Sequence, residues 1–255
     1  MDVVMRKVLL TTLVSLVASM ATAGGIPPDV ADLIDGAELL TDSQDFVGSF
    51  VFTLTTVIQK PNGKARHAME MVVETTRHGD GSVDHLLIRM VKDGKDVTAA
   101  NRGKVDKLMA EETESEDNAD EGDEDFVDPF GETADRYQFS SLRREGDSVL
   151  VDFEPQPNHR KGDGMAAGTV AWHFETLDPL WMEIEAVEPP KPTTEFAMRI
   201  EFERLGELVH VQRLFTTGLA NIILIKRQFE MDIQVTDVRP GGDQSSESSM
   251  EKFIE

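Results

Sequence analysis

The chain has 255 residues, of which 40% are hydrophobic, and its formal net charge is -23. So acidic a chain repels nucleic acid and anionic membrane surfaces, which argues against both as partners. It contains no cysteine, which excludes disulfides, thiol catalysis, cysteine metal sites and a lipid anchor on cysteine.

The first residues have the pattern of a secretory signal peptide. A basic pair, Arg6 and Lys7, precedes an apolar run that extends to Met20, and an Ala-Thr-Ala cleavage pattern ends at Ala23. The run is shorter than the ~20 residues that span a bilayer, so we expect residues 1–23 to be removed. Losing one acidic and two basic side chains shifts the net charge from -23 to -24. Export without disulfides indicates a periplasmic location.

Residues 24–240 are expected to form a single domain, because no linker and no repeat period divides them. The domain is predicted to begin with a helix. Val30, Leu33 and Ile34 recur at helical spacing, just after two prolines at a position where a helix tolerates them. This pattern predicts an amphipathic helix of about three turns.

From Asp45 onwards the period of the apolar residues changes to two, which is typical of half-buried strands. The stretch PLWMEIEA at 179–186 is one example, with apolar and acidic residues in alternation. Short turns separate the strands, so consecutive strands are expected to form hairpins. The sequence predicts about nine to eleven strands and only one or two helices, the second of them at 97–110. This count predicts a mostly β protein with one antiparallel sheet, strongly curved or closed.

One acidic segment interrupts the strands. Residues 111–128 carry eleven acidic side chains and almost no hydrophobic ones, which predicts a mobile insert. The spacing of the aspartates does not follow the pattern of an ordered calcium loop, so we expect no metal site. Residues 241–255 are polar and are expected to form a disordered tail.

The sequence has no motif that indicates catalysis. It lacks a G-x-S-x-G elbow, a dinucleotide-binding G-x-G-x-x-G, a P-loop and an H-E-x-x-H zinc motif. The six histidines are scattered, without the clustering that metal sites normally show. We therefore expect a protein that is not an enzyme and that needs no cofactor.

The apolar face of the strands is the candidate functional surface. Methionine is flexible and polarisable, so a face lined by Met and Phe adapts to ligands of varied shape. The same side chains could instead fill an ordinary sandwich core, because periodicity does not distinguish a filled interior from a lined cavity. The candidate ligand-binding residues on this face are Phe50, Phe52, Met69, Met71, Trp172, Met182, Ile184, Met198 and Phe202.

Over nearly all of residues 24–240, the chain resembles the LolA-like family of periplasmic outer-membrane lipoprotein-sorting proteins. The order of elements contributes to the resemblance: a signal peptide, an opening amphipathic helix, and then an antiparallel meander. The segments that carry it are DVT at 96–98, DRYQF at 135–139, GTVAWHFET at 168–176, PLWMEIEA at 179–186, MRIEFER at 198–204 and LIKRQFEM at 224–231.

The resemblance implies an incomplete half β-barrel, lidded by helices, around a hydrophobic cavity that carries the acyl chains of lipoproteins or a related lipid. It implies that the candidate residues line this cavity and that Val30, Leu33 and Ile34 belong to a lid helix. It also implies a monomer that takes cargo from a donor and delivers it to an acceptor envelope protein towards the outer membrane. The chain departs from the family pattern in two respects: we see no clear counterpart of the arginine that holds the lid, and the acidic insert is longer.

A second interpretation gives the same fold a different role. The domain would be an envelope sensor or protein-interaction module, whose acidic insert docks on a basic surface of a partner.

Overall fold

The computed structural model describes the larger part of the chain. The parts that it describes are residues 47–63, 66–80, 82–103, 136–140, 142–159, 165–189, 192–206, 208–222 and 225–241. The predicted signal peptide, the lid helix with Val30, Leu33 and Ile34, the acidic insert and the tail after 241 lie outside these ranges.

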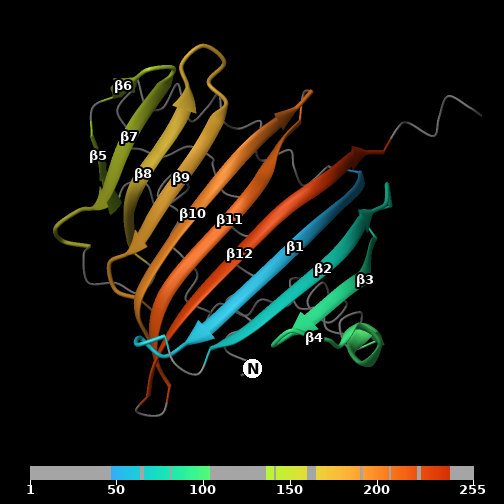
Figure 1. Cartoon of the computed structure of the whole chain (residues 1–255). Coiled ribbons are helices and arrows are strands. Elements are labelled where there is room, and N and C mark those ends of the chain that lie inside the picture. Colours follow the sequence, from blue (N-terminus) through green and yellow to red (C-terminus); the bar gives the residue numbers. More distant parts are fainter. Residues whose placement is uncertain are drawn as a thin grey trace, which may run out of the picture.

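Twelve strands form one antiparallel sheet in this part of the chain (Figure 1). The strands are β1 (Gly48–Gln59), β2 (His67–Arg77), β3 (Val83–Lys92), β4 (Lys95–Asp96), β5 (Tyr137–Phe139), β6 (Arg143–Glu145), β7 (Ser148–Pro155), β8 (Ala166–His173), β9 (Pro179–Ala186), β10 (Thr193–Leu205), β11 (Leu208–Ile222) and β12 (Ile225–Pro240). The prediction of a mostly β, antiparallel sheet is confirmed. The sequence predicts about nine to eleven strands, and one short strand that it does not indicate is β6, which spans three residues.

The sheet is curved and open. Its strand order is β4-β3-β2-β1-β12-β11-β10-β9-β8-β7-β5, and β6 pairs with β7 on the same side as β5. The edges are therefore formed by β4 at one end and by β5 and β6 at the other, and the sheet does not close into a barrel. This open, curved sheet is the incomplete barrel that the resemblance implies.

The centre of the sheet joins the first described strand to the last one. Each meander runs between neighbours in sequence, from β1 to β4 and from β7 to β12, so most pairs are simple hairpins. Between these two meanders, β1 pairs with β12 over eleven residue pairs, from Gly48 opposite Pro240 to Gln59 opposite Gln228.

Local turn chemistry fixes the hairpins where the sequence predicts them. Between β3 and β4, Asp93 and Gly94 both have positive φ, at 50° and 77°, which is the backbone of a two-residue hairpin turn. The Asp93 carboxylate also accepts a hydrogen bond from the Ala68 amide at 2.9 Å, which ties this turn to β2.

A single short helix is described, at 98–103 directly after β4, and it coincides with the start of the helix predicted at 97–110. Within the described ranges, no helix has the length and apolar character needed to cross a membrane.

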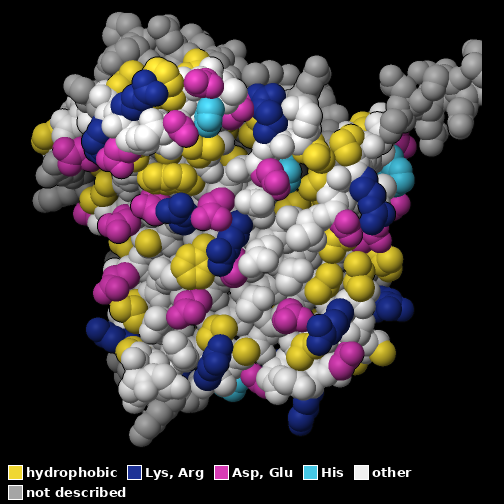
Figure 2. Space-filling model, turned by 45° about the horizontal axis from the view of Figure 1, so that its top comes forward, with side chains coloured by type: hydrophobic (Ala, Val, Ile, Leu, Met, Phe, Trp, Pro, Cys, Tyr) yellow, Lys and Arg dark blue, Asp and Glu magenta, His cyan; other side chains and the backbone are white. Residues whose placement is uncertain are grey.

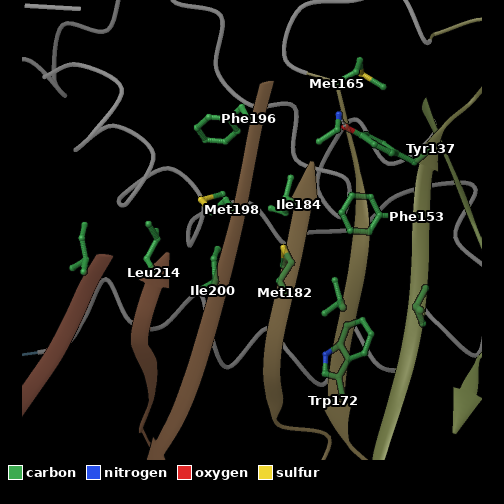
Figure 3. Packing of buried hydrophobic residues seen from close by; sticks show 14 of the residues in the cluster. Tyr137, Phe153, Met165, Trp172, Met182, Ile184, Phe196, Met198, Ile200 and Leu214 are labelled. Carbon is green, nitrogen blue, oxygen red and sulfur yellow. Dashed lines mark hydrogen bonds between the residues drawn. The ribbon is translucent and has the colours of Figure 1, made fainter. Parts of the chain in front are cut away.

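The hydrophobic core lies against one face of the sheet. Because side chains alternate between faces, most of the longer strands place their apolar phase on this side and their polar phase on the other. We call the side that carries Trp172, Met182, Ile200 and Leu214 the core face, and the opposite side the outer face. Figure 3 shows these side chains standing beside one another on neighbouring strands.

Candidate functional site

An unbroken row of apolar side chains crosses the core face. Residues that lie directly opposite one another on neighbouring strands share a face, so the strand register defines the row. Its nine members, which we call the apolar row, are Val151, Val170, Met182, Ile200, Leu214, Ile233, Leu54, Met71 and Met90, from β7 to β3. The row spans nine strands without a polar side chain.

The neighbouring row contains polar groups at regular intervals. Its central part, which we call the Met/Thr ladder, consists of Met198, Thr216, Met231, Thr56 and Met69 on β10, β11, β12, β1 and β2. Thr216 is 2% exposed and Thr56 is 5% exposed. Neither hydroxyl has a hydrogen-bond partner in the structure. Two buried hydroxyls are thus held without partners in an otherwise apolar setting.

The residues predicted as ligand-binding all lie on strands, and nearly all contribute to the hydrophobic cluster. Trp172, Met182, Ile184 and Met198 are fully buried members of it. The remaining predicted residues are partly buried: Phe52, Met69, Met71 and Phe202, which pack against the cluster, and Phe50, whose ring lies 6.4 Å from that of Phe52. The predicted set therefore divides into a buried half on β8 to β10 and a half-exposed group that is mostly on β1 and β2.

The rings of two phenylalanines lie close to a glycine on the neighbouring strand. Phe153 on β7 faces Gly168 on β8, and Phe229 on β12 faces Gly218 on β11. A Cβ at Gly168 would lie 2.0 Å from the Glu183 carbonyl oxygen and 2.7 Å from Phe153 Cζ. At Gly218 it would lie 2.3 Å from Phe229 Cζ. Each phenylalanine ring thus occupies the space that a side chain would need if the glycine opposite it were replaced by another residue.

One buried threonine on the core face does have a hydrogen-bond partner. On β2, Thr75 is 5% exposed, but its hydroxyl lies 3.0 Å from Nδ1 of His85 in hydrogen-bond contact across the β2–β3 pair. Thr75 is therefore a satisfied counterpart of Thr56 and Thr216.

Arg227 brings a positive charge to one end of the core face. It stands opposite the buried Ala220 on β11, two residues before Phe229, and therefore shares the face of the cluster. Its Nη1 is buried without a hydrogen-bond partner. Among the described residues, it is the one arginine with such a nitrogen. An anionic group would satisfy it.

The outer face has a different chemistry, because its charges are paired. Arg213 on β11 donates two hydrogen bonds to Asp232 on β12, at 2.8 and 2.9 Å. Arg199 on β10 bonds both Glu183 and Glu201 and stacks 4.8 Å from the Trp181 ring centroid. Figure 2 shows such basic and acidic side chains lying next to one another.

These pairs influence the acidity of their members. Hydrogen bonds from Arg143, and then from Thr169, lower the pKa of Asp152 below its usual value. A hydrogen bond from Arg204 is the main cause of a similar lowering of the Asp178 pKa. Near Arg204, at the same end of the β10–β11 hairpin, burial is the main cause of a lowered pKa of His210. The first two effects stabilise charged carboxylates; the last favours a neutral imidazole.

A groove of about 520 Å³ lies at the β5 end of the sheet. It is lined by Gln138, Phe139, Ser140, Asp152, Phe153, Glu154, Ala167, Gly168, Thr169, Glu183 and Glu185. None of the predicted ligand-binding residues is among them, and its acidic side chains include partners of the outer-face ion pairs. No group of three or more His, Asp or Glu side chains within the described ranges is placed to hold a metal ion.

Sequence reasoning missed three residues of the core face: Thr56, Thr216 and Arg227. Each is a polar residue on the apolar phase of its strand, next to members such as Leu54, Leu214 and Phe229. A polar residue at an apolar position of the alternation was the signal that could have identified them. The alternation does not show whether such a side chain is buried or lacks a hydrogen-bond partner, so it does not reveal a site.

Solved structures of other proteins are similar to this chain in fold. A domain from Vibrio parahaemolyticus named for outer membrane lipoprotein sorting matches with 11% identity and a TM-score of 0.31, over 84% of this chain and 96% of that one. A DUF1329 family protein from Desulfovibrio piger matches with 10% identity and a TM-score of 0.33, over 86% and 95%. MucB, in its complex with MucA from Pseudomonas aeruginosa, matches with 13% identity and a TM-score of 0.21, over 83% and 100%.

These are likenesses of fold. No family model and no curated protein sequence matches the chain.

Proposed function

We propose that this protein is a periplasmic carrier that binds the acyl chains of lipoproteins, or another lipid, against the core face and delivers them towards the outer membrane. The main observation that supports this proposal is the apolar row, which runs without a polar interruption across nine strands of an open sheet. An acyl chain and a row of this kind are both long, narrow and apolar.

The hydrophobic effect supplies the affinity in this proposal. Each methylene group that leaves water contributes about 0.8 kcal/mol, so a chain of ordinary length gains enough to leave solution. The gain is not directional, so the chain can move on to any partner that offers a more extensive apolar groove. A non-catalytic carrier needs no more chemistry than this.

The half-exposed group gives the cargo a route of entry in this proposal. Phe52, Met69 and Met71 are only partly buried, whereas Met182 and Ile184 are covered. An acyl chain would first contact the methionines of β2, which adapt their shape readily, and would then extend along the row.

The test is to purify the chain from the periplasm of an expressing bacterium and to analyse co-purified lipid by mass spectrometry. Displacement of a hydrophobic fluorescent dye by added fatty acid or phospholipid provides the affinity. We expect bound lipid and competitive displacement. A protein that carries no lipid and binds neither dye nor acyl chain would overturn the proposal.

A matched pair of variants assigns the binding to the core face. Met71→Asp places a carboxylate in the half-exposed part of the apolar row, and Glu70→Asp alters the neighbouring residue on the opposite face. We expect Met71→Asp to reduce dye and lipid affinity at least tenfold and Glu70→Asp to leave both unchanged. Circular dichroism checks that both variants fold.

A further inference from the structure

The Met/Thr ladder contains the two side chains on the core face whose chemistry is least explained by packing. A buried hydroxyl without a partner costs free energy, and native proteins rarely keep one without a reason. Here two occur in one row, Thr216 at 2% and Thr56 at 5% exposure, and each faces the apolar side of the sheet.

The surroundings of the two hydroxyls exclude a local role. Each threonine lies between two methionines of neighbouring strands, and no hydrogen bond to a methionine sulfur or to any other atom satisfies it. By contrast, the hydroxyl of Thr75 on the same face reaches His85 at 3.0 Å. The fold is therefore able to pair a threonine on this face, and it leaves these two unpaired.

The geometry points to a ligand: we propose that Thr56 and Thr216 donate hydrogen bonds to the carbonyl oxygens of a bound acyl lipid. Because Met231 separates them, they are two strands apart, or about 10 Å. One carbonyl oxygen cannot accept from both. The ligand that fits is a lipid with two acyl ester groups, which offers two acceptors and two chains for the apolar row.

This inference rests on the proposed function and adds a selectivity to it. An apolar face alone binds any hydrocarbon chain, whereas a pair of hydroxyl donors favours chains that are attached through a carbonyl. The flanking methionines provide the flexible walls that allow the carbonyls to approach.

The experiment compares two lipids that differ only in the two carbonyl groups. Dimyristoyl phosphatidylglycerol and its ditetradecyl ether analogue compete against a fluorescent acyl probe on the purified full chain. We expect the diester to bind about tenfold more tightly than the diether, since each hydrogen bond contributes a few-fold to the affinity. In the Thr56→Val/Thr216→Val double variant the ratio falls to about one, and the affinity for the diether is unchanged.

Two controls separate a ligand site from a structural role. Thr56→Ser/Thr216→Ser retains both donors, and we expect it to retain the preference for the diester. In the lipid-free protein, Thr56→Val and Thr216→Val should not lower the melting temperature, because each removes an unpaired hydroxyl. Thr75→Val should lower it, because it leaves His85 without that contact.

Equal binding of diester and diether by the wild-type chain would overturn the inference and leave the proposed function intact. A preference that survives in the Thr→Val double variant would have the same consequence, as would a melting temperature that falls as it does for Thr75→Val. Failure of both lipids to displace the probe would overturn the proposed function and this inference with it.

Discussion

The two faces of this sheet differ in whether their polar side chains have partners. On the outer face of β9 to β12, the arginines are paired: Arg199 bonds two glutamates and Arg213 forms a two-bond pair with Asp232. On the core face, Thr56, Thr216 and Arg227 keep buried polar atoms without partners. The arginines of the outer face are thus paired within the chain, although the buried Nδ1 of His210 on that face has no partner, and the core face contains three buried polar groups without a hydrogen-bond partner in the structure.

The largest expected difference between the faces concerns the two tryptophans. Trp172 is 2% exposed on the core face, whereas Trp181 is half-buried and lies against Arg199. We expect Trp172→Ala to reduce the free energy of unfolding by about 3–5 kcal/mol and Trp181→Ala to reduce it by about 1 kcal/mol. Urea unfolding followed by circular dichroism measures both. Similar losses would show that the two faces are equally packed.

A smaller effect is expected from filling the space beneath a ring. A methyl group at Gly168 would lie 2.0 Å from a backbone oxygen, so Gly168→Ala should cost about 1–3 kcal/mol of unfolding free energy. Gly79 has open space around it, and Gly79→Ala should change the stability by less than about 0.5 kcal/mol. Thermal melts of the two variants test the difference. A stable Gly168→Ala protein would contradict the close approach of Phe153.

Arginine provides the third contrast between the faces. Arg227→Gln should weaken binding of an anionic phospholipid about three- to tenfold, because its buried nitrogen lacks an internal partner, and should not lower stability. Arg213→Gln should leave lipid binding unchanged, because its charge is already paired with Asp232. Lipid titrations at two salt concentrations provide the measurement. If the two variants weakened lipid binding equally, the proposed difference between Arg227 and Arg213 would be wrong.

A modest pH effect is expected from an ion pair. Arg204 lowers the pKa of Asp178, so the charged carboxylate is favoured in the folded state. Its contribution is present above the pKa of the unfolded chain, near 4, and is lost as the pH falls through the lower folded value. Asp178→Asn should therefore reduce the unfolding free energy at pH 7 by up to about 1 kcal/mol.

The deficit of Asp178→Asn should shrink as the pH falls below about 4. Asp147→Asn, at an exposed turn, is the control and should show little change at any pH. A deficit that stays constant from pH 7 to pH 3 would exclude the ion pair as its cause. Urea titrations across this range give the required values.

The smallest effect is expected from deleting residues 111–128, which should leave lipid affinity unchanged. If the protein is instead an interaction module, the deletion should abolish capture of a basic envelope partner while lipid binding persists. Dye displacement and affinity capture from an envelope extract distinguish these results. A loss of lipid affinity would show that the core face does not act alone.

The sequence predicts those features of the fold that depend on near neighbours. Period-two alternation identifies the strands, and the Asp93-Gly94 pair marks a hairpin, because both signals lie within a few residues. The same alternation places Met182, Ile184 and Met198 correctly on the buried side. The short strand β6 escapes it because alternation needs more than the three residues that β6 contains.

The remaining features depend on partners that are distant in sequence. The Met/Thr ladder requires the register of five strands, from Met198 on β10 to Met69 on β2, and no local pattern specifies it. The fit of Phe153 against Gly168 likewise needs the β7–β8 pairing. The signal peptide, the lid helix and a cavity lined by the candidate residues stay predictions.

The pairing of β1 with β12 has a consequence for how the chain reaches its folded state. Residues near 50 must meet residues near 235, so the central seam has the largest sequence separation in the sheet. Contacts of this kind form slowly, because a long loop must close before any hydrogen bond is gained. During synthesis the first meander emerges well before its partner strand. Until β12 arrives, β1 presents an unpaired edge, and the cell must protect that edge against pairing with other chains.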